Sequence, residues 1–339
     1  MKKSFTLIEI LVVIVILGIL ATIATKILIR VYENYYYSRE FNKLLFKSDL
    51  ALNIISSKLS HRIKNSVIAV KCNVENDNCI KGIVDDFNSL GVIDSKNENE
   101  YKILEWIGED VYAKRGMWSD RLKRVQFGYS GFVDLKMTDI LGNDEYNITT
   151  PDSNFSIVKI IDSNWTLSWG IEGDVFNKNY TVLVFSGSDD RGDFLDINHS
   201  YGYYQNLDKN NSATRVFKII GFRDDVNKSV IQVKAIDESN SSSVYEKYYL
   251  VNSAYAIVPV ANRDEKGNII DYNLTLFFNY YPWNGQSFKD GNSSLLVSNV
   301  TQFKFKEQNG VIRILICVDA PKIKIDNEPI TVCKEKVVF

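Results

Sequence analysis

Apolar positions along the first 66 residues follow two patterns, and both predict helix. From Phe5 to Thr25 the chain is a continuous apolar run with one charged residue, Glu9. A helix of this length measures roughly 30 Å, the thickness of a bilayer's hydrocarbon core. Beyond it, apolar residues recur at three- and four-residue steps between Lys, Arg, Ser and Asn. These positions are Phe41, Leu44, Leu45, Leu52, Ile55, Leu59 and Ile63.

The two patterns join without a helix breaker, because no Pro or Gly occurs from Ile19 to Val70. We therefore predict one helix over 5–66, in which 5–25 spans a membrane and the remainder packs an apolar stripe against a sheet. A coiled coil is the alternative for the second half, but the heptad phase is not held long enough to favour it.

From residue 67 onward the pattern changes to short runs rich in Val, Ile, Tyr, Phe and Thr between Asn, Asp, Gly and Ser, which predicts strands and loops. The fold class is therefore α+β, with a long N-terminal transmembrane and packing helix followed by an antiparallel β-rich globular head over 67–339. The predicted strands are Arg124–Tyr129, Ser156–Ile161, Tyr180–Phe185, Arg215–Phe222, Val230–Ile236, Lys247–Val260, Tyr272–Tyr280, Val300–Glu307 and Val311–Val318.

Composition and charge narrow the function classes. The 339 residues carry a net charge of −2 and are 45% hydrophobic, so the head is large enough for a real core and has no electrostatic footprint for nucleic acid. We predict no direct nucleic-acid binding. Lys2 and Lys3 place the N-terminus in the cytoplasm and the head beyond the membrane, in the periplasm if the cell has one. A cleaved secretory signal is the alternative; the apolar run is too long for it and lacks a small-x-small cleavage site.

A short basic leader precedes Phe5-Thr6-Leu7-Ile8-Glu9. This beginning resembles the N-terminus of type IV prepilins and pseudopilins and matches their motif residue by residue. The resemblance implies that prepilin peptidase cuts between Ser4 and Phe5, so that 1–4 is a leader, and that the new Phe5 amine is methylated. It also implies that Glu9 neutralises the Phe5 amine of a neighbouring subunit. Ser4 stands where the family usually has Gly, and this small residue is compatible with slower cleavage.

The passage Ser294–Val318 is similar to the closing strands of J-type minor pseudopilins of type II secretion and of PilW-like minor pilins. Residues 85–245 match no family pattern, so we predict that they enlarge the head. The resemblance implies a minor pilin or pseudopilin of a type II secretion or type IV pilus-like fibre, at its tip or in its initiating complex. The implied partners are other pilin subunits, prepilin peptidase, the inner-membrane assembly platform and the inner membrane, which the chain crosses once before it enters the fibre.

Two alternatives stay open for this function. The same N-terminus also serves competence and DNA-uptake pseudopilins. A membrane-anchored periplasmic binding module or adhesin could share only the processing signal. Enzymatic activity is not predicted, because the chain has two histidines and no G-x-S-x-G, H-E-x-x-H or phosphate-loop motif. No cofactor is predicted either.

Four cysteines form two local pairs, Cys72 with Cys79 and Cys317 with Cys333. An even count in an exported domain favours disulfides. Closing the later loop would contribute about 3 kcal/mol in the chain-entropy model, and many type IV pilins close a C-terminal loop in this way. Zinc is the alternative, but His61 and His199 lie far from any cysteine in sequence.

Asn-x-Ser/Thr sequons form a second signal. At nine of eleven such sites the residue two places before the Asn is acidic, which resembles the extended acceptor sequon of bacterial oligosaccharyltransferases. We predict N-glycosylation, with an oligosaccharyltransferase as a further partner and each modified residue on the surface. The alternative is that turns favour Asp, Asn and Ser together. The predicted acceptors are Asn147, Asn154, Asn164, Asn198, Asn210, Asn227, Asn240, Asn273 and Asn292.

Two polar clusters offer further chemistry. An oxygen-rich stretch around two glycines is a candidate Ca²⁺ site, although a solvated loop is the favoured interpretation; its acids are Asp189, Asp190, Asp193 and Asp196. Five basic residues flank Trp118, a pattern that suits single-strand binding. Acids dilute this cluster, so a solvated face is favoured there too; the basic residues are Lys114, Arg115, Arg121, Lys123 and Arg124.

Overall fold

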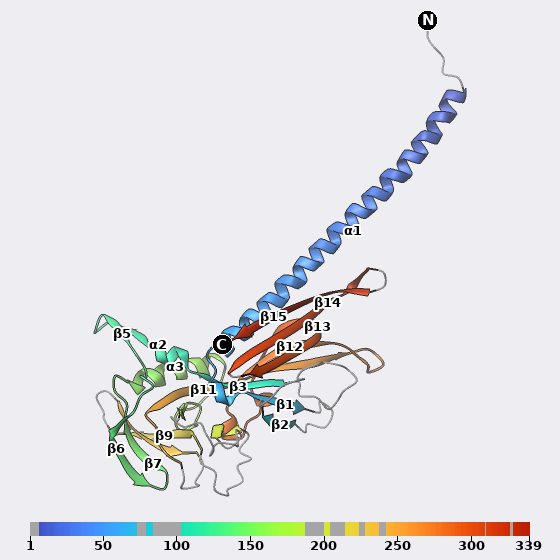
Figure 1. Ribbon diagram of the computed structural model, residues 1–339. Helices are drawn as coiled ribbons and strands as arrows, with labels where there is room; N and C mark the ends of the chain where they lie inside the picture. Colours follow the sequence, from blue (N-terminus) through green and yellow to red (C-terminus); the bar gives the residue numbers. More distant parts are fainter. Residues whose placement is uncertain are drawn as a thin grey trace.

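The computed structural model describes residues 7–72, 79–83, 103–186, 200–203, 214–223, 228–236, 242–308, 310–325 and 328–339. It has the predicted α+β architecture, in which a long helix, α1 (Leu7–Leu59), leads into a β-rich head. In Figure 1 the N-terminal half of α1 runs away from every strand, whereas the C-terminal half lies along strands β13 to β15.

The C-terminal half of α1 docks through the apolar stripe that the sequence predicts. Leu44, Leu52, Ile55 and Leu59 are buried, while Phe41 and Leu45 pack partly buried at the edge of the same core. Steps of three and four residues place these side chains on one face of the helix. The stripe is thus confirmed.

The predicted end of the helix is wrong, because α1 ends at Leu59 and not near Ser66. The backbone leaves the helix to join strand β3 (Ile103–Glu109): Arg62 forms a bridge with Gly108, and the Ile63 amide donates to the Ile107 carbonyl at 2.9 Å. Arg62 then caps the helix, donating to the carbonyls of Leu59 at 2.8 Å and Gly310 at 2.6 Å. Residues Lys64–Ser66 form a single 3₁₀ turn.

The strands of the head form one large antiparallel sheet in the order β15-β14-β13-β12-β11-β8-β9-β10-β7-β6, with β3 also pairing β11, and β1 pairing β3 and β2. Two short strands, β4 (Met117–Ser119) and β5 (Arg124–Gln126), form a separate ribbon. The bounds are β1 Ile68–Cys72, β2 Cys79–Ile83, β6 Asp134–Gly142, β7 Glu145–Thr149, β8 Val182–Ser186, β9 Val216–Phe222, β10 Val230–Ala235, β11 Lys247–Arg263, β12 Ile269–Tyr280, β13 Asn292–Gln308, β14 Val311–Ile325 and β15 Glu328–Val338.

One predicted strand is wrong, since Ser156–Ile161 belongs to helix α3 (Phe155–Ser168). Asn154 caps this helix by accepting from the Ser156 amide at 3.0 Å. The buried side chains of Phe155, Val158 and Asp162 then follow at helical steps. Arg124–Tyr129 is strand only to Gln126, because the Gly128 amide donates to Ala113 of the short helix α2 (Val111–Arg115). Strands β1, β2, β3, β4, β6, β7 and β15 are additional to the predicted set.

The sheet is buried on both faces at its centre. On β8, Val182 and Val184 join a first core beneath α1, whereas Leu183 and Phe185 join a second core beneath α3. Alternate side chains of a strand point to opposite faces, so β8 separates the two cores. β11 passes through both, because its start pairs with β8 and its later part pairs with β12.

The division of the chain into a leader, 1–4, an N-terminal segment, 5–66, and a head, 67–339, stays a prediction, although the helix itself ends at Leu59. Residues of the second core run from Ala113 to Leu250 and so overlap the predicted enlargement, 85–245. Strand β3 also lies within that range but builds the first core with β1 and β11.

Candidate functional site

The N-terminal half of α1 is the first candidate site, because every residue from Leu7 to Tyr37 is exposed. Within the described part of the chain, α1 is the one helix that is long and apolar enough to cross a membrane. Glu9 lies in its first turn, where the positive end of the helix dipole stabilises a carboxylate. The predicted cleavage site, Ser4 and Phe5, lies outside the described residues.

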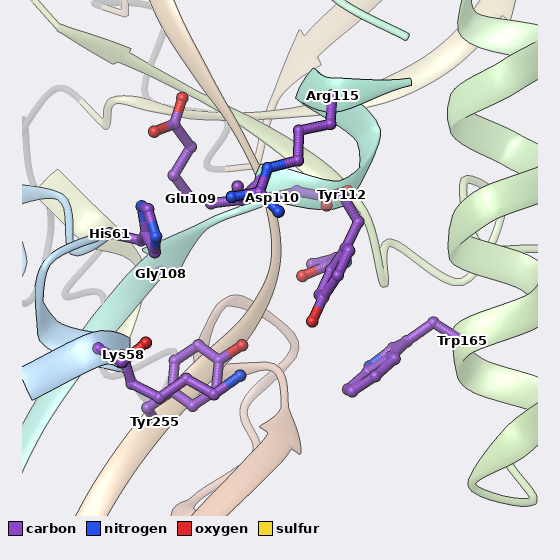
Figure 2. A pocket seen from close by; sticks show the side chains of 12 residues that line it. Lys58, His61, Gly108, Glu109, Asp110, Tyr112, Arg115, Trp165 and Tyr255 are labelled. Carbon is purple, nitrogen blue, oxygen red and sulfur yellow. The ribbon is translucent and has the colours of Figure 1, made fainter. Parts of the chain in front are cut away.

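A second candidate site is a pocket of about 190 Å³ at the junction of α1 with the head (Figure 2). Lys58 and His61 reach it from the end of α1, and Trp165 reaches it from α3. The corner between β3 and α2 forms another wall, and β11 closes the pocket. These walls include Gly108, Glu109, Asp110, Tyr112, Arg115, Asn252 and Tyr255.

Aromatic rings make the rigid walls of this pocket. Tyr112 stacks on Trp165 with ring centroids 6.1 Å apart, and the Trp165 Nε1 donates to Asn279 Oδ1 at 2.8 Å. Opposite them, Tyr255 lies against Gly108. A Cβ at that glycine would stand 2.5 Å from Tyr255 Cε2, so a larger residue would push the ring off β3.

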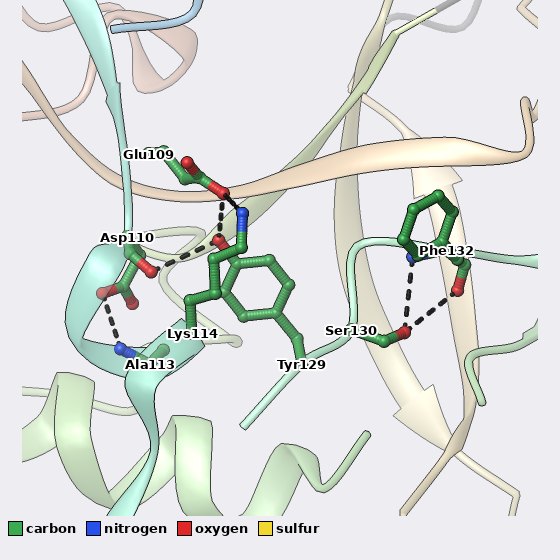
Figure 3. Close-up of polar contacts among 7 residues, drawn as sticks. All are labelled: Glu109, Asp110, Ala113, Lys114, Tyr129, Ser130 and Phe132. Atoms are coloured by element: carbon green, nitrogen blue, oxygen red, sulfur yellow. Dashed lines mark hydrogen bonds and ion pairs between the residues drawn. The ribbon is translucent and has the colours of Figure 1, made fainter. Parts of the chain in front are cut away.

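Glu109 is neutralised within its own corner. Its Oε1 accepts from Lys114 Nζ at 2.5 Å and from the Tyr129 hydroxyl at 3.0 Å, as Figure 3 shows. The Tyr129 hydroxyl also lies 3.3 Å from the Asp110 carbonyl oxygen. Burial, followed by the nearby Glu109 and Asp110 carboxylates, raises the pKa of Tyr129, so it remains a hydrogen-bond donor.

Asp110 forms the inner end of the pocket and caps α2, because its Oδ1 accepts from the Ala113 amide at 2.9 Å. Its carboxyl also meets that of Asp162 on α3. Asp162 in turn accepts from Thr181 Oγ1, and from Asn252 Nδ2 at 3.2 Å. Burial raises the pKa of both acids, and for Asp162 the neighbouring Asp110 raises it further. Two buried carboxyls in contact are stable when they share one proton.

Lys58 is the half-buried cation of the pocket. Its Nζ lies 5.2 Å from the centroid of the Tyr255 ring, and burial lowers the pKa of the ammonium. Figure 2 shows the side chain crossing that ring, with its amino end on the side of Trp165. Among the residues that the structure describes, no carboxylate lies within ion-pair distance of Lys58.

The structure describes a disulfide for one of the two predicted cysteine pairs and only the strand register for the other. Cys317 and Cys333 are opposite one another on β14 and β15 and form a disulfide, with their Cα atoms 4.0 Å apart. Cys72 and Cys79 are opposite one another on β1 and β2. A disulfide between this second pair stays a prediction.

The predicted sequons are not equally available. Asn147 is only 4% exposed within β7, so it does not meet the surface requirement and we withdraw it as an acceptor in the folded chain. The side chains of three others make hydrogen bonds: Asn154 caps α3, Asn273 donates to Asn262, and Asn292 accepts from Asn279. Asn164, on α3, is exposed. The others, Asn198, Asn210, Asn227 and Asn240, lie outside the described residues.

The acid before each of four described sequons has a structural contact of its own. Glu145 pairs with Lys234 at 3.0 Å, and Asp162 is the buried partner of Asp110. Asp271 accepts from Asn262, and Asp290 completes a capping box with Ser287. The fold therefore accounts for these acids without a glycan.

Neither polar cluster becomes a site in the described residues. The candidate calcium ligands Asp189, Asp190, Asp193 and Asp196 lie outside them, and no metal-ligand cluster occurs in the part of the chain that the structure describes. Four of the five basic residues lie on the β4–β5 ribbon or at its base beside exposed Trp118, whereas Lys114 is engaged by Glu109.

Comparison with known proteins bears on the N-terminus. Residues 1–25 match the family model of the prokaryotic N-terminal methylation motif. The match is consistent with the type IV pilin and pseudopilin superfamily, and it covers the segment that holds Phe5 and Glu9. Comparison with curated proteins and with solved structures finds no match.

The exposed apolar half of α1 fits the role that the methylation motif implies for it. The motif implies processing by prepilin peptidase and assembly with other pilin subunits. The exposed apolar helix indicates the membrane anchoring typical of prepilins. Proteins with this motif are structural rather than enzymatic.

Sequence reasoning missed the pocket at the junction. In the sequence, Asp110 is one of the acids that dilute the basic cluster around Trp118, and Asp162 is the acid two places before the Asn164 sequon. Lys58 carried no signal, because a lysine at helical spacing ordinarily lies on a solvated face. These residues come together only when α1, α2, α3 and β11 meet.

Proposed function

We propose that the chain is a minor pilin or pseudopilin subunit. The observation that carries the proposal is a helix with two unlike halves: the first exposes its apolar side chains over Leu7–Tyr37, and the second docks on the head. A membrane covers the first half before assembly, and neighbouring subunits cover it in the fibre. The methylation motif at 1–25 supplies the processing signal for this exchange.

In this proposal the chain is an inner-membrane protein with a cytoplasmic N-terminus and a periplasmic head. Prepilin peptidase cuts it after Ser4, and the assembly platform then moves it into a type II secretion or type IV pilus-like fibre. Glu9 pairs with the Phe5 amine of a neighbour, which lowers the cost of placing its carboxylate in an apolar surrounding.

The size of the head supports a minor role. A second core beneath α3 adds a lobe to the side of the sheet farthest from strands β13 to β15, where strands β6 and β7 lie (Figure 1). A subunit of this breadth would crowd a lattice in which every neighbour carries the same lobe. We therefore place it at the tip or in the initiating complex.

Glu9→Ala tests the proposal in the native host. The variant is expected to reach the membrane at the wild-type level but to be absent from sheared fibres, as measured by immunoblot of both fractions. Glu33→Ala is the matched control, because Glu33 is an exposed acid of the same helix beyond the apolar run. Normal incorporation of the Glu9 variant would refute the proposal.

The anchor itself separates the fibre subunit from the binding-module alternative. Replacing 5–65 by an unrelated transmembrane anchor would leave a binding module active at the cell surface but would abolish a fibre subunit. Loss of DNA uptake, and not of secretion or piliation, in the deletion strain would instead favour the competence alternative.

Glycosylation stays part of the proposal in a narrower form. Asn164 is the exposed acceptor among the described sequons, and the four outside the described residues stay candidates. Calcium binding by the acids of 189–196 likewise stays a proposal. Mass spectrometry of the native protein decides the first, and calcium titration of the purified chain decides the second.

A further inference from the structure

The charges that line the junction pocket are not balanced. Its acids already have contacts: Glu109 pairs with Lys114 and accepts from the Tyr129 hydroxyl, and the Asp110 carboxyl faces the buried carboxyl of Asp162. Its cations lack such partners in the part of the chain that the structure describes. Among the described residues Lys58 and Arg115 have no ion-pair partner, and His61 also faces the pocket.

A half-buried ammonium without a counter-ion is costly, and the cost falls when an anion enters beside it. Lys58 lies in the last turn of α1, where the helix dipole favours a cation, and its Nζ lies over the Tyr255 ring. The amino group faces a cavity whose opposite wall is the Tyr112–Trp165 pair.

We propose that this pocket binds a small carboxylate ligand, with the carboxylate at Lys58 and the body of the ligand against Trp165. The volume of about 190 Å³ equals roughly six water molecules, which admits a free acid or one acidic sugar ring and excludes a folded chain segment. Asn252 and the Asp110 carboxyl offer hydrogen bonds to hydroxyl groups on such a ligand.

The rigid walls of the pocket favour ligand binding, because two of its aromatic rings are held in place before a ligand enters. Trp165 is held by its bond to Asn279, and Tyr255 is held flat on β3 by Gly108. A ligand therefore loses little free energy to reorganisation of the pocket. The site lies on the head and not on the exposed half of α1, so it is independent of the fibre role.

The test uses the purified full chain in detergent, titrated with acetate, glutamate, D-glucuronate and, as the neutral counterpart, D-glucose. Binding is followed by calorimetry and by protection of Lys58 from amine acetylation, read by mass spectrometry. We expect at least one carboxylate to bind saturably and to protect Lys58, and glucose to do neither.

Three variants assign the effect to the cation. Lys58→Met should weaken binding roughly 10- to 100-fold, the usual range for a lost charge-assisted hydrogen bond. Lys58→Arg should retain most of it. Lys136→Met, at an exposed lysine on β6, should change nothing. Thermal melting checks that each variant is folded.

Two results would overturn the proposal. One is that no carboxylate in the panel protects Lys58 or binds saturably. The other is that glucose and glucuronate bind equally well and Lys58→Met binds both like the wild type.

Discussion

Single buried residues hold the junction between helix and head. Arg62 donates to the carbonyls of Leu59, Gly310 and Phe339, and so ties the end of α1 to both ends of the last hairpin unit. Gly108 bridges to Arg62, and next along the chain Asp110 meets Asp162, which ties α2 to α3. Both arrangements place ionisable groups away from water, where each depends on its own partners.

The Asp110–Asp162 pair makes stability depend on pH. Since burial raises the pKa of both acids above the ordinary value of about 3.9, the folded chain retains a proton that the unfolded chain has released. This contribution is complete below pH of about 4 and is lost as pH rises through the raised pKa.

Asp162→Asn should remove that dependence, because an amide needs no proton to meet Asp110. We expect the free energy of unfolding, measured by urea denaturation from pH 5 to pH 8, to fall less steeply than in the wild type, by up to about 1.4 kcal/mol per pH unit. Asp120→Asn, at an exposed acid of the β4–β5 turn, serves as the control. Identical slopes in all three proteins would show that the pair does not share a proton.

At the scale of elements, the last hairpin, formed by β14 and β15, supports α1. Strand β15 is the edge strand of the sheet, and it contacts the helix through Lys336 to Asn53 and Lys334 to Asp49. The Cys317–Cys333 disulfide fixes β15 to β14. It therefore holds the surface on which the second half of α1 packs.

The double variant Cys317→Ser/Cys333→Ser should lower the free energy of unfolding by about 3 kcal/mol, since the bond closes a loop with a sequence separation of 16. Chemical denaturation without reductant measures the difference. The double variant Cys72→Ser/Cys79→Ser, at the cysteine pair on β1 and β2, gives the change in the free energy of unfolding with which this loss is compared. A change under about 1 kcal/mol would mean that strand pairing alone holds β15.

At the scale of the whole molecule, α1 has a second exposed surface beyond the membrane segment. Phe46 is 70% exposed, and Leu50 follows one turn later, on the face turned away from the head. These residues form a separate apolar patch, since Arg39, Asn42 and Lys43 lie between it and the exposed first half of the helix. In the proposed fibre this surface contacts a neighbouring subunit.

Phe46→Ser should therefore leave folding unchanged within about 0.5 kcal/mol, the usual range for an exposed substitution, and reduce incorporation into fibres. Ile140→Ser is the matched control, because Ile140 is 77% exposed on β6, far from α1 in the sheet order. Thermal melting and the sheared-fibre immunoblot give the two readouts. Equal incorporation of both variants would remove Phe46 from the subunit interface.

Local signals were sufficient for the helix and for most strands. The apolar stripe of α1 and the runs of β-branched and aromatic residues of β8 to β14 are visible in the chain because each is a property of one element's own residues. Ser156–Ile161 failed for a related reason. Its run of Ile, Val and Lys suits either a strand or a helix, and the Asn154 cap together with the second core selected the helix.

The sequence by itself determined a membrane-length N-terminal helix and a prepilin-type motif, because the apolar run and FTLIE are properties of contiguous residues. It also determined the late cysteine pair and the β-rich head. Only the tertiary structure decided that Asp110 meets Asp162, that Lys58 faces Trp165, and that Asn147 is buried. Those residues are far apart in the chain, and their chemistry depends on water exclusion and on partners that only packing supplies.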